Sequence, residues 1–225
     1  MTNINSYITK LEQIVYEKIS EEINEKTIDR IINENLYNSH IKNIKSANFQ
    51  NYYFETLNNE NMFFNSSNFF RQFKMQYALQ GIDNNYLDNL GKNKREIITL
   101  IRKDSLAQLY FETFYKTRIK HKDSFKEKNL GSFFAKLVHT FQPDKYCALD
   151  NPIKEYFGLL KESFFISFLI ISKEYANWGK NNQKIIETIK TKLRIVDKKE
   201  IIKQEKLTDL KLLDLIFWSK ANEKK

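Results

Sequence analysis

The sequence predicts an all-α fold, and three observations support this prediction. Only 5 glycines and 2 prolines occur among 225 residues, whereas β-rich folds need many turn residues. Hydrophobic residues make up 41% of the chain and aromatic residues 14%, which is enough for a substantial core. Apolar residues recur three and four positions apart along most of the chain, as on one face of a helix. This length fits one helical domain over residues 1–225, or a helical bundle of two lobes.

The N-terminal part begins with two predicted helices. The first covers Ile4–Ile19, where apolar residues follow helical spacing. The second covers Ser20–Leu36, and Glu21 and Glu22 suit its N-terminus because acidic residues offset the positive end of the helix dipole. Residues 37–68 are rich in asparagine and irregular in pattern. These residues are expected to form short helices or one small hairpin. Their role is either an insertion that contacts the substrate or packing of the fold.

Two further helices are predicted in the middle of the chain. The first covers Asn68–Gln80, and a polar loop follows at Gly81–Lys94. The second, the longest candidate, covers Lys94–Lys120 and breaks near Asp104-Ser105. The segment Lys116–Lys128 carries six Lys and Arg residues, one His and two acids. It is expected to form the exposed end of this helix and a loop.

Three helices are predicted after the central segment, at Lys161–Trp178, Asn182–Ile195 and Thr208–Ala221. Thr208 suits an N-cap, because its hydroxyl can accept a hydrogen bond from a backbone N–H of the first turn. The only cysteine, Cys147, follows a tyrosine in an apolar stretch. It is expected to be a small core residue.

Charge is distributed unevenly along the chain. Residues 1–90 form an acidic part, with 8 Lys and Arg against 11 Asp and Glu, whereas residues 91–225 form a basic part, with 29 against 17. The net charge of +9 therefore comes from the second part. A basic surface of this kind attracts polyanions, most often nucleic acid. The alternative is an ordinary solvated surface in a chain rich in lysine.

Several classes of site and location are excluded or disfavoured. The N-terminus lacks the basic start and apolar stretch of a signal peptide, and the longest apolar run, Phe164–Ile171, is far shorter than the roughly 20 residues of a membrane span. We therefore expect a cytoplasmic protein with no membrane partner. Three scattered histidines and one cysteine predict no metal site and no disulfide framework. Phosphate-binding, dinucleotide and hydrolase motifs are missing, so no cofactor is expected. The oligomeric state stays open.

The segment 128–158 concentrates the features that suggest chemistry. It holds both prolines and the only cysteine. The pattern predicts a tight turn at Leu130-Gly131-Ser132, a short helix carrying Lys136, a loop at Gln142–Asp144, and a helix that opens at Asp150-Asn151-Pro152. A lysine and an aspartate thus lie near the starts of two adjacent helices.

Each candidate residue in this segment has a functional and a structural interpretation. Lys136, if partly desolvated, can attack a sugar C1′ and form a Schiff base, or it is a surface lysine. Asp150 can stabilise positive charge on a deoxyribose ring, or it is the N-cap of a helix with Pro152 in the first turn. His139 can face DNA, or it is a satisfied, partly buried histidine.

On these residues, the segment resembles the helix-hairpin-helix superfamily of DNA glycosylases, in particular the 8-oxoguanine DNA glycosylase branch. That branch has the pattern L-x-G-x-G-x-K-x-A, then a loop, then an aspartate before a helix. Gly131 matches one hairpin glycine, Lys136 the catalytic lysine and Asp150 the catalytic aspartate. The second hairpin glycine is replaced, Asn-Pro follows the aspartate, and the spacing from lysine to aspartate is short.

The resemblance implies a helix-hairpin-helix glycosylase-like bundle that excises a modified or damaged base and cleaves the abasic site. It implies Lys136 as nucleophile, Asp150 as stabiliser of the sugar cation, and double-stranded DNA as partner. We expect the DNA-binding residues to be Gly131, Ser132, Lys116, Arg118, Lys120, Lys122 and His139. The alternative is a non-catalytic helical module that binds nucleic acid or protein, for example within a bacterial defence system.

Overall fold

The computed structural model describes residues 4–121 and 124–223, and 71% of the chain is helical. The predicted all-α fold is confirmed. In this part of the chain, no helix is both long enough and apolar enough to cross a bilayer. The helical elements are α1 (Ile4–Glu22), α2 (Ile28–Arg30), η1 (Ile31–Lys42), α3 (Ile44–Thr56), α4 (Glu60–Asn65), α5 (Phe69–Gln76), α6 (Asn84–Lys92), α7 (Lys94–Arg102), α8 (Leu106–Leu109), η2 (Tyr110–Phe114), α9 (Gly131–Phe141), α10 (Asn151–Tyr156), α11 (Phe164–Asn181), α12 (Gln183–Val196), η3 (Gln204–Lys206) and α13 (Asp209–Asn222). The strands are β1 (Thr117–His121) and β2 (Ser124–Lys128).

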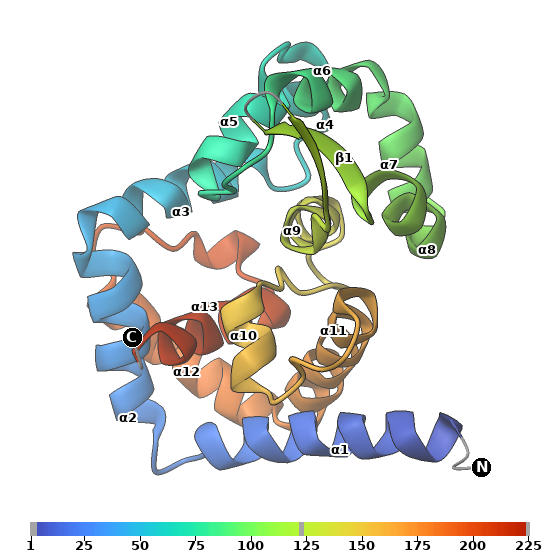
Figure 1. Ribbon diagram of the computed structural model, residues 1–225. Helices are drawn as coiled ribbons and strands as arrows, with labels where there is room; N and C mark the ends of the chain where they lie inside the picture. Colours follow the sequence, from blue (N-terminus) through green and yellow to red (C-terminus); the bar gives the residue numbers. More distant parts are fainter. Residues whose placement is uncertain (1–3, 122–123, 224–225) are drawn as a thin grey trace.

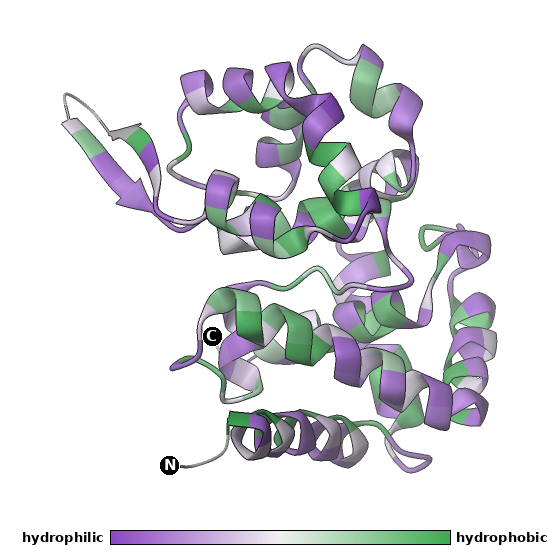
Figure 2. Ribbon diagram, turned by 90° about the vertical axis from the view of Figure 1, so that its right-hand side faces the viewer, coloured by the Kyte–Doolittle hydropathy of each residue, from purple (hydrophilic) through white to green (hydrophobic). Residues whose placement is uncertain are grey.

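The helices form two lobes, which Figures 1 and 2 show one above the other. The central lobe holds α4 to α9 and the two strands (residues 60–141). The terminal lobe combines both ends of the chain (residues 4–42 and 151–222), because α1 packs against α11 and α13 packs against η1. Helix α3 links the two lobes at one side (Figure 1). The position where the charge balance changes, near residue 90, lies within α6.

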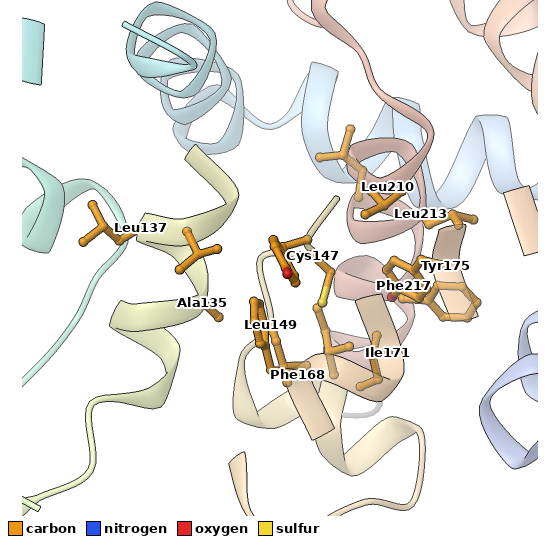
Figure 3. Close-up of a cluster of buried hydrophobic side chains, with 14 of the residues drawn as sticks. Ala135, Leu137, Cys147, Leu149, Phe168, Ile171, Tyr175, Leu210, Leu213 and Phe217 are labelled. Carbon is orange, nitrogen blue, oxygen red and sulfur yellow. The ribbon is translucent and has the colours of Figure 1, made fainter. Parts of the chain in front are cut away.

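One apolar core runs through both lobes, and α9 lies at its centre. Phe133 and Phe134 of α9 are buried against aromatic rings of both lobes; the Phe134 ring centroid is 5.0 Å from that of Tyr110 and 5.2 Å from that of Phe168. Figure 3 shows how residues of α9, α11, α13 and the loop after α9 gather in this core. Cys147 is fully buried there, which confirms it as a small core residue.

The second helix differs from its prediction. Helix α1 continues to Glu22, and the next helix begins only at Ile28 and extends through η1 to Lys42. The chain turns where Thr27 Oγ1 accepts a hydrogen bond from the Asn24 N–H at 3.0 Å, whereas Ser20 Oγ bonds within α1. The break therefore depends on a local side-chain bond rather than on the acidic pair. The region 37–68 forms helices, not a hairpin.

The middle of the chain contains three departures. Helix α5 ends at Gln76, and the predicted loop Gly81–Lys94 contains α6, whose N-cap Asp83 accepts a hydrogen bond from the Tyr86 N–H at 3.0 Å. The predicted break near Asp104-Ser105 is confirmed, with φ of 60° at Asp104. The helical stretch that follows ends at Phe114, six residues before the expected end.

The segment Lys116–Lys128 is a β-hairpin, not the predicted helix end and loop. Lys116, with φ of 48°, lies in the left-handed region between η2 and β1. The antiparallel pairs include Arg118 opposite Glu127 and Ile119 opposite Lys126. Side chains alternate between the faces of the ribbon, so Ile119 is buried while Arg118 is exposed. The hairpin projects from the central lobe (Figure 2).

Gly131 opens α9 beneath an aromatic ring. A Cβ at this position would lie 2.3 Å from Cγ of Phe164, so alanine must displace this partly buried ring, which packs against the core. We expect Gly131→Ala to lower the free energy of unfolding by about 1–3 kcal/mol in urea denaturation. Gly91→Ala is the matched control, because no contacting atom of the described residues lies within 4 Å of its added Cβ and alanine favours helix by about 1 kcal/mol. Equal effects of the two substitutions would contradict this role.

Candidate functional site

Lys136 and Asp150 meet at the boundary between the lobes. The Lys136 Nζ lies 3.9 Å from Asp150 Oδ2, and the two side chains are 12% and 13% exposed. Almost every side chain of α9 enters the core, but Ser132 and Lys136, one turn apart, lie on the half-buried stripe. The helix thus directs Lys136 out of the core and towards the carboxylate.

Asp150 is the N-cap of α10, as predicted. Its Oδ1 accepts a hydrogen bond from the Ile153 N–H at 3.2 Å, and Pro152 lies in the first turn. The other carboxylate oxygen, Oδ2, faces Lys136. The cap therefore holds the carboxylate in a fixed direction while one oxygen stays directed at the lysine.

Two hollows meet at this ion pair. The inner cavity has a volume of about 250 Å³ and is lined by residues of η1, α3, α9 and α13. The outer cleft has a volume of about 880 Å³ and is lined by residues of η2, α9 and the segment before α11. Five residues line both hollows: Tyr77, Ala78, Lys136, Asp150 and Trp218. The Lys136–Asp150 pair is thus accessible from both the inner cavity and the outer cleft.

A second pair of ionisable residues lies in the inner cavity. Lys211 and Asp214 of α13 are 5% and 4% exposed, and both line this cavity. Their spacing of three residues places them on one face of α13. Asp214 Oδ2 accepts a hydrogen bond from the Ala148 N–H at 2.7 Å. The prediction of a helix at Thr208–Ala221 did not include this pair, although two charges inside a long apolar run are an unusual pattern for a core helix.

Burial controls the protonation of these groups. It lowers the pKa of the Lys136 ammonium, and the charges of Asp150 and Asp214 oppose this shift. It likewise lowers the pKa of Lys211 and raises the pKa of Asp214. A lysine with a lowered pKa has a larger neutral fraction, and only the neutral amine is a nucleophile. Lys136 is therefore better prepared for attack than a lysine on the surface.

His139 is fully buried, and both of its ring nitrogens are bonded. Nε2 lies 2.7 Å from the Tyr53 hydroxyl, and Nδ1 lies 2.6 Å from the Tyr146 carbonyl oxygen. Burial, with a smaller contribution from the Lys211 charge, lowers the pKa of His139 to about 3. The neutral ring therefore donates from Nδ1 and accepts at Nε2, which leaves neither nitrogen for DNA. The structural interpretation of His139 fits the fold.

The other DNA-binding candidates surround the outer cleft or lie on the hairpin. Gly131 and Ser132 line the cleft, at the start of a helix with no side-chain N-cap. Lys116 and Arg118 are exposed on the hairpin, where the Arg118 guanidinium carbon lies 4.6 Å from the centroid of the Phe125 ring. Lys120 belongs to β1, and Lys122 lies outside the described residues.

Adjacent aromatic side chains, which could stack on an extruded base, differ in exposure. The pairs Phe69-Phe70 and Phe133-Phe134 are buried in the core, so they cannot act as a wedge. The outer cleft instead presents Phe111 and Tyr115, which are 53% and 37% exposed.

In the part of the chain that the structure describes, no three His, Cys, Asp and Glu side chains gather where they could hold a metal ion. The Lys136 amine and the Asp150 carboxylate line both hollows, and the inner cavity adds the buried Lys211 and Asp214 of α13. Such a set can supply a nucleophile, a proton and a counter-charge. No protein-family model, curated protein or solved structure matches the chain.

Proposed function

We propose that the protein binds double-stranded DNA and excises a modified or damaged base, acting as a DNA glycosylase with abasic-site lyase activity. The convergence of Lys136 and Asp150 at the junction of the inner cavity and the outer cleft carries this proposal. The neutral Lys136 amine attacks C1′ of the deoxyribose and forms a Schiff base. The Asp150 carboxylate stabilises the positive charge that develops on the sugar as the base leaves.

The two hollows fit the parts of an extruded nucleotide. A base that leaves the helix costs a few kcal/mol of stacking and pairing, and contacts in a pocket offset that cost. The inner cavity offers the rings of Phe49 and Tyr77 as apolar walls. The outer cleft, being larger, suits the sugar and the backbone. With the ion pair between them, C1′ lies near both catalytic groups.

Charge on the rim supports DNA as the partner. The segment Lys116–Lys128 carries six Lys and Arg residues and two acids, and Lys128 at the end of β2 lines the outer cleft. Basic side chains on an exposed ribbon can contact phosphates without reading the base sequence. The hairpin is therefore placed to hold DNA across the opening of the cleft.

A change in salt dependence tests this rim. Each phosphate contact contributes roughly 0.9 to the slope of log K against log salt concentration. We expect Lys116→Gln combined with Arg118→Gln to reduce this slope by about 2 in fluorescence anisotropy titrations with duplex DNA. The control combines Lys173→Gln with Arg71→Gln, because both residues are paired with acids away from the cleft. An unchanged slope in the hairpin variant would remove it from the DNA interface.

The activity itself is tested with a panel of modified and mismatched duplexes. Abasic-site formation is measured, and borohydride is added to trap a Schiff base. The proposal predicts base loss from at least one duplex and a trapped complex with wild-type protein. If no duplex loses a base, and if no complex is trapped even with a preformed abasic duplex, the proposed enzymatic activity is rejected.

One observation favours a second function, a non-catalytic nucleic-acid-binding module. Asp150 Oδ1 already serves the cap of α10, and a cap alone explains an aspartate before Asn-Pro. The module predicts salt-sensitive DNA binding with no base release and no trapping. The enzyme predicts DNA binding, base release and trapping, so the same panel of duplexes separates the two functions.

A further inference from the structure

Lys211 is a buried cation without a conventional partner. Its side chain is 5% exposed, and Nζ lies 3.8 Å from the centroid of the Tyr53 ring. Among the described residues, no hydrogen bond or ion pair is made by this ammonium group. A cation–π contact contributes about 2 kcal/mol when desolvated, which is less than the cost of burying an ammonium group. The ammonium group is therefore stabilised by the Tyr53 ring and, at longer range, by the charge of Asp214, and its own N–H donors are left for a ligand.

Two acceptors in the same cavity are also unpartnered. Gln50 Oε1 and Asp214 Oδ1 are buried with no hydrogen-bond partner among residues 4–121 and 124–223, and both residues line the inner cavity. Buried polar groups normally find partners within the protein. Three unsatisfied groups around one cavity indicate a ligand that supplies the missing partners.

The position of Lys211 relates it to a particular part of the proposed substrate. Lys136 and Asp150 line both the inner cavity and the outer cleft, whereas Lys211 lines only the inner cavity. If the sugar lies at the ion pair, the base occupies the inner cavity and meets Lys211. As the glycosidic bond breaks, negative charge develops on the base, on the side of the sugar where Lys211 lies.

We propose that Lys211 is the acid that protonates the departing base. This inference rests on the proposed glycosylase activity and assigns a separate residue to its leaving group. The C1′–N bond breaks and its electron pair stays on the base nitrogen. Lys211 transfers one proton to the base, which leaves uncharged, and the resulting amine regains a proton from solvent. C1′ accepts the electron pair of the neutral Lys136 amine, and one proton of Lys136 passes to solvent.

The surroundings of Lys211 suit proton donation at neutral pH. Burial lowers its pKa, so its ammonium is a stronger acid than that of a surface lysine. Burial holds the pKa of His40 at about 4 and that of His139 at about 3, so both rings are neutral in this range. The titratable and charged groups around the cavity, from every element packed against Lys211, are His40, Lys45, Tyr53, Tyr77, Lys136, His139, Asp150 and Asp214.

Base release and abasic-site trapping separate this role from that of Lys136. A preformed abasic duplex has no base to protonate, so trapping there needs Lys136 but not an acid for the leaving group. We expect Lys211→Met to slow base release by about 10²-fold more than it slows trapping at an abasic site. Methionine fills the same volume without the charge, and thermal unfolding verifies that the variant is folded. Lys173→Gln, at an exposed pair on α11, is the matched control.

The pH dependence gives a second measurement. Base release by wild-type protein should fall as pH rises through the lowered pKa of Lys211, because the ammonium is then lost. Trapping at an abasic duplex should rise with pH, because it needs the neutral Lys136 amine. In the Lys211→Met variant, the rate of base release should no longer fall as pH rises through this range.

Each outcome decides the assignment. Equal slowing in both assays, or base release that still falls with rising pH in Lys211→Met, would overturn Lys211 as the acid and leave Lys136 as the nucleophile. Trapping by wild type with no base release from any duplex would overturn it as well, since the protein would then be a lyase alone. Wild-type protein that neither traps nor releases would overturn the proposed function itself.

Discussion

Replacing Lys136 with glutamine is expected to abolish trapping by borohydride and to slow base release by about 10³-fold or more, because its amine lies beside Asp150 where the two hollows meet. The covalent complex requires an amine at the ion pair with Asp150. The measurement is the yield of trapped protein–DNA complex on a denaturing gel, with base release followed in parallel.

The pH profile of wild-type trapping checks the same residue. Burial lowers the pKa of Lys136 below the ordinary 10.5, so the neutral amine increases as pH rises and trapping reaches a plateau below the pH that a free lysine would need. Lys173→Gln should behave as wild type. Full trapping by Lys136→Gln would assign the nucleophile to another lysine, and Lys211 and Lys45 also line the inner cavity.

Replacing Asp150 with asparagine should separate its two roles. Asparagine is as good an N-cap as aspartate, so its side-chain oxygen can still accept from the Ile153 N–H and stability should change by less than about 0.5 kcal/mol. The negative charge that faces Lys136 is lost, and base release should slow by about 10²–10³-fold, as when one charge-stabilising group is removed from other enzymes.

The alanine variant completes the comparison. Asp150→Ala removes both the cap and the charge, so it should lose about 1 kcal/mol of stability as well as activity. Both quantities are measured by urea denaturation and by base release on one duplex. An active Asp150→Asn together with a destabilised Asp150→Ala would mean that Asp150 serves the helix alone.

Local chemistry explains which elements the sequence predicted well. The caps at Asp150 and Thr208 depend on bonds to backbone groups three residues away, so a short stretch of sequence specifies them. The break at Asp104 is equally local. The hairpin was missed because its strands carry mostly polar and charged residues, and no Asn-Gly or Asp-Gly turn marks it. The alternation of Ile119 with its charged neighbours Arg118 and Lys120 was the sequence pattern that indicated a strand.

Long-range packing explains what the sequence could not predict in the site. The burial of His139 could not be predicted locally, because its partner Tyr53 lies 86 residues away along the chain. The inner cavity likewise combines α3, α9 and α13, whose contact no local pattern encodes. Lys136 and Asp150 were found because they are close in sequence, whereas Gln50 and Lys211 become neighbours only in the folded chain.

The division of the terminal lobe between both ends of the chain has a consequence for how the protein is made. Helices α1 and η1 leave the ribosome before α11 and α13, against which they pack. At 5–20 residues per second, the apolar face of η1 waits roughly 10–30 s for α13. The central lobe, a continuous segment, can fold meanwhile. Because α13 brings Lys211 and Asp214, the inner cavity forms only after α13 has left the ribosome.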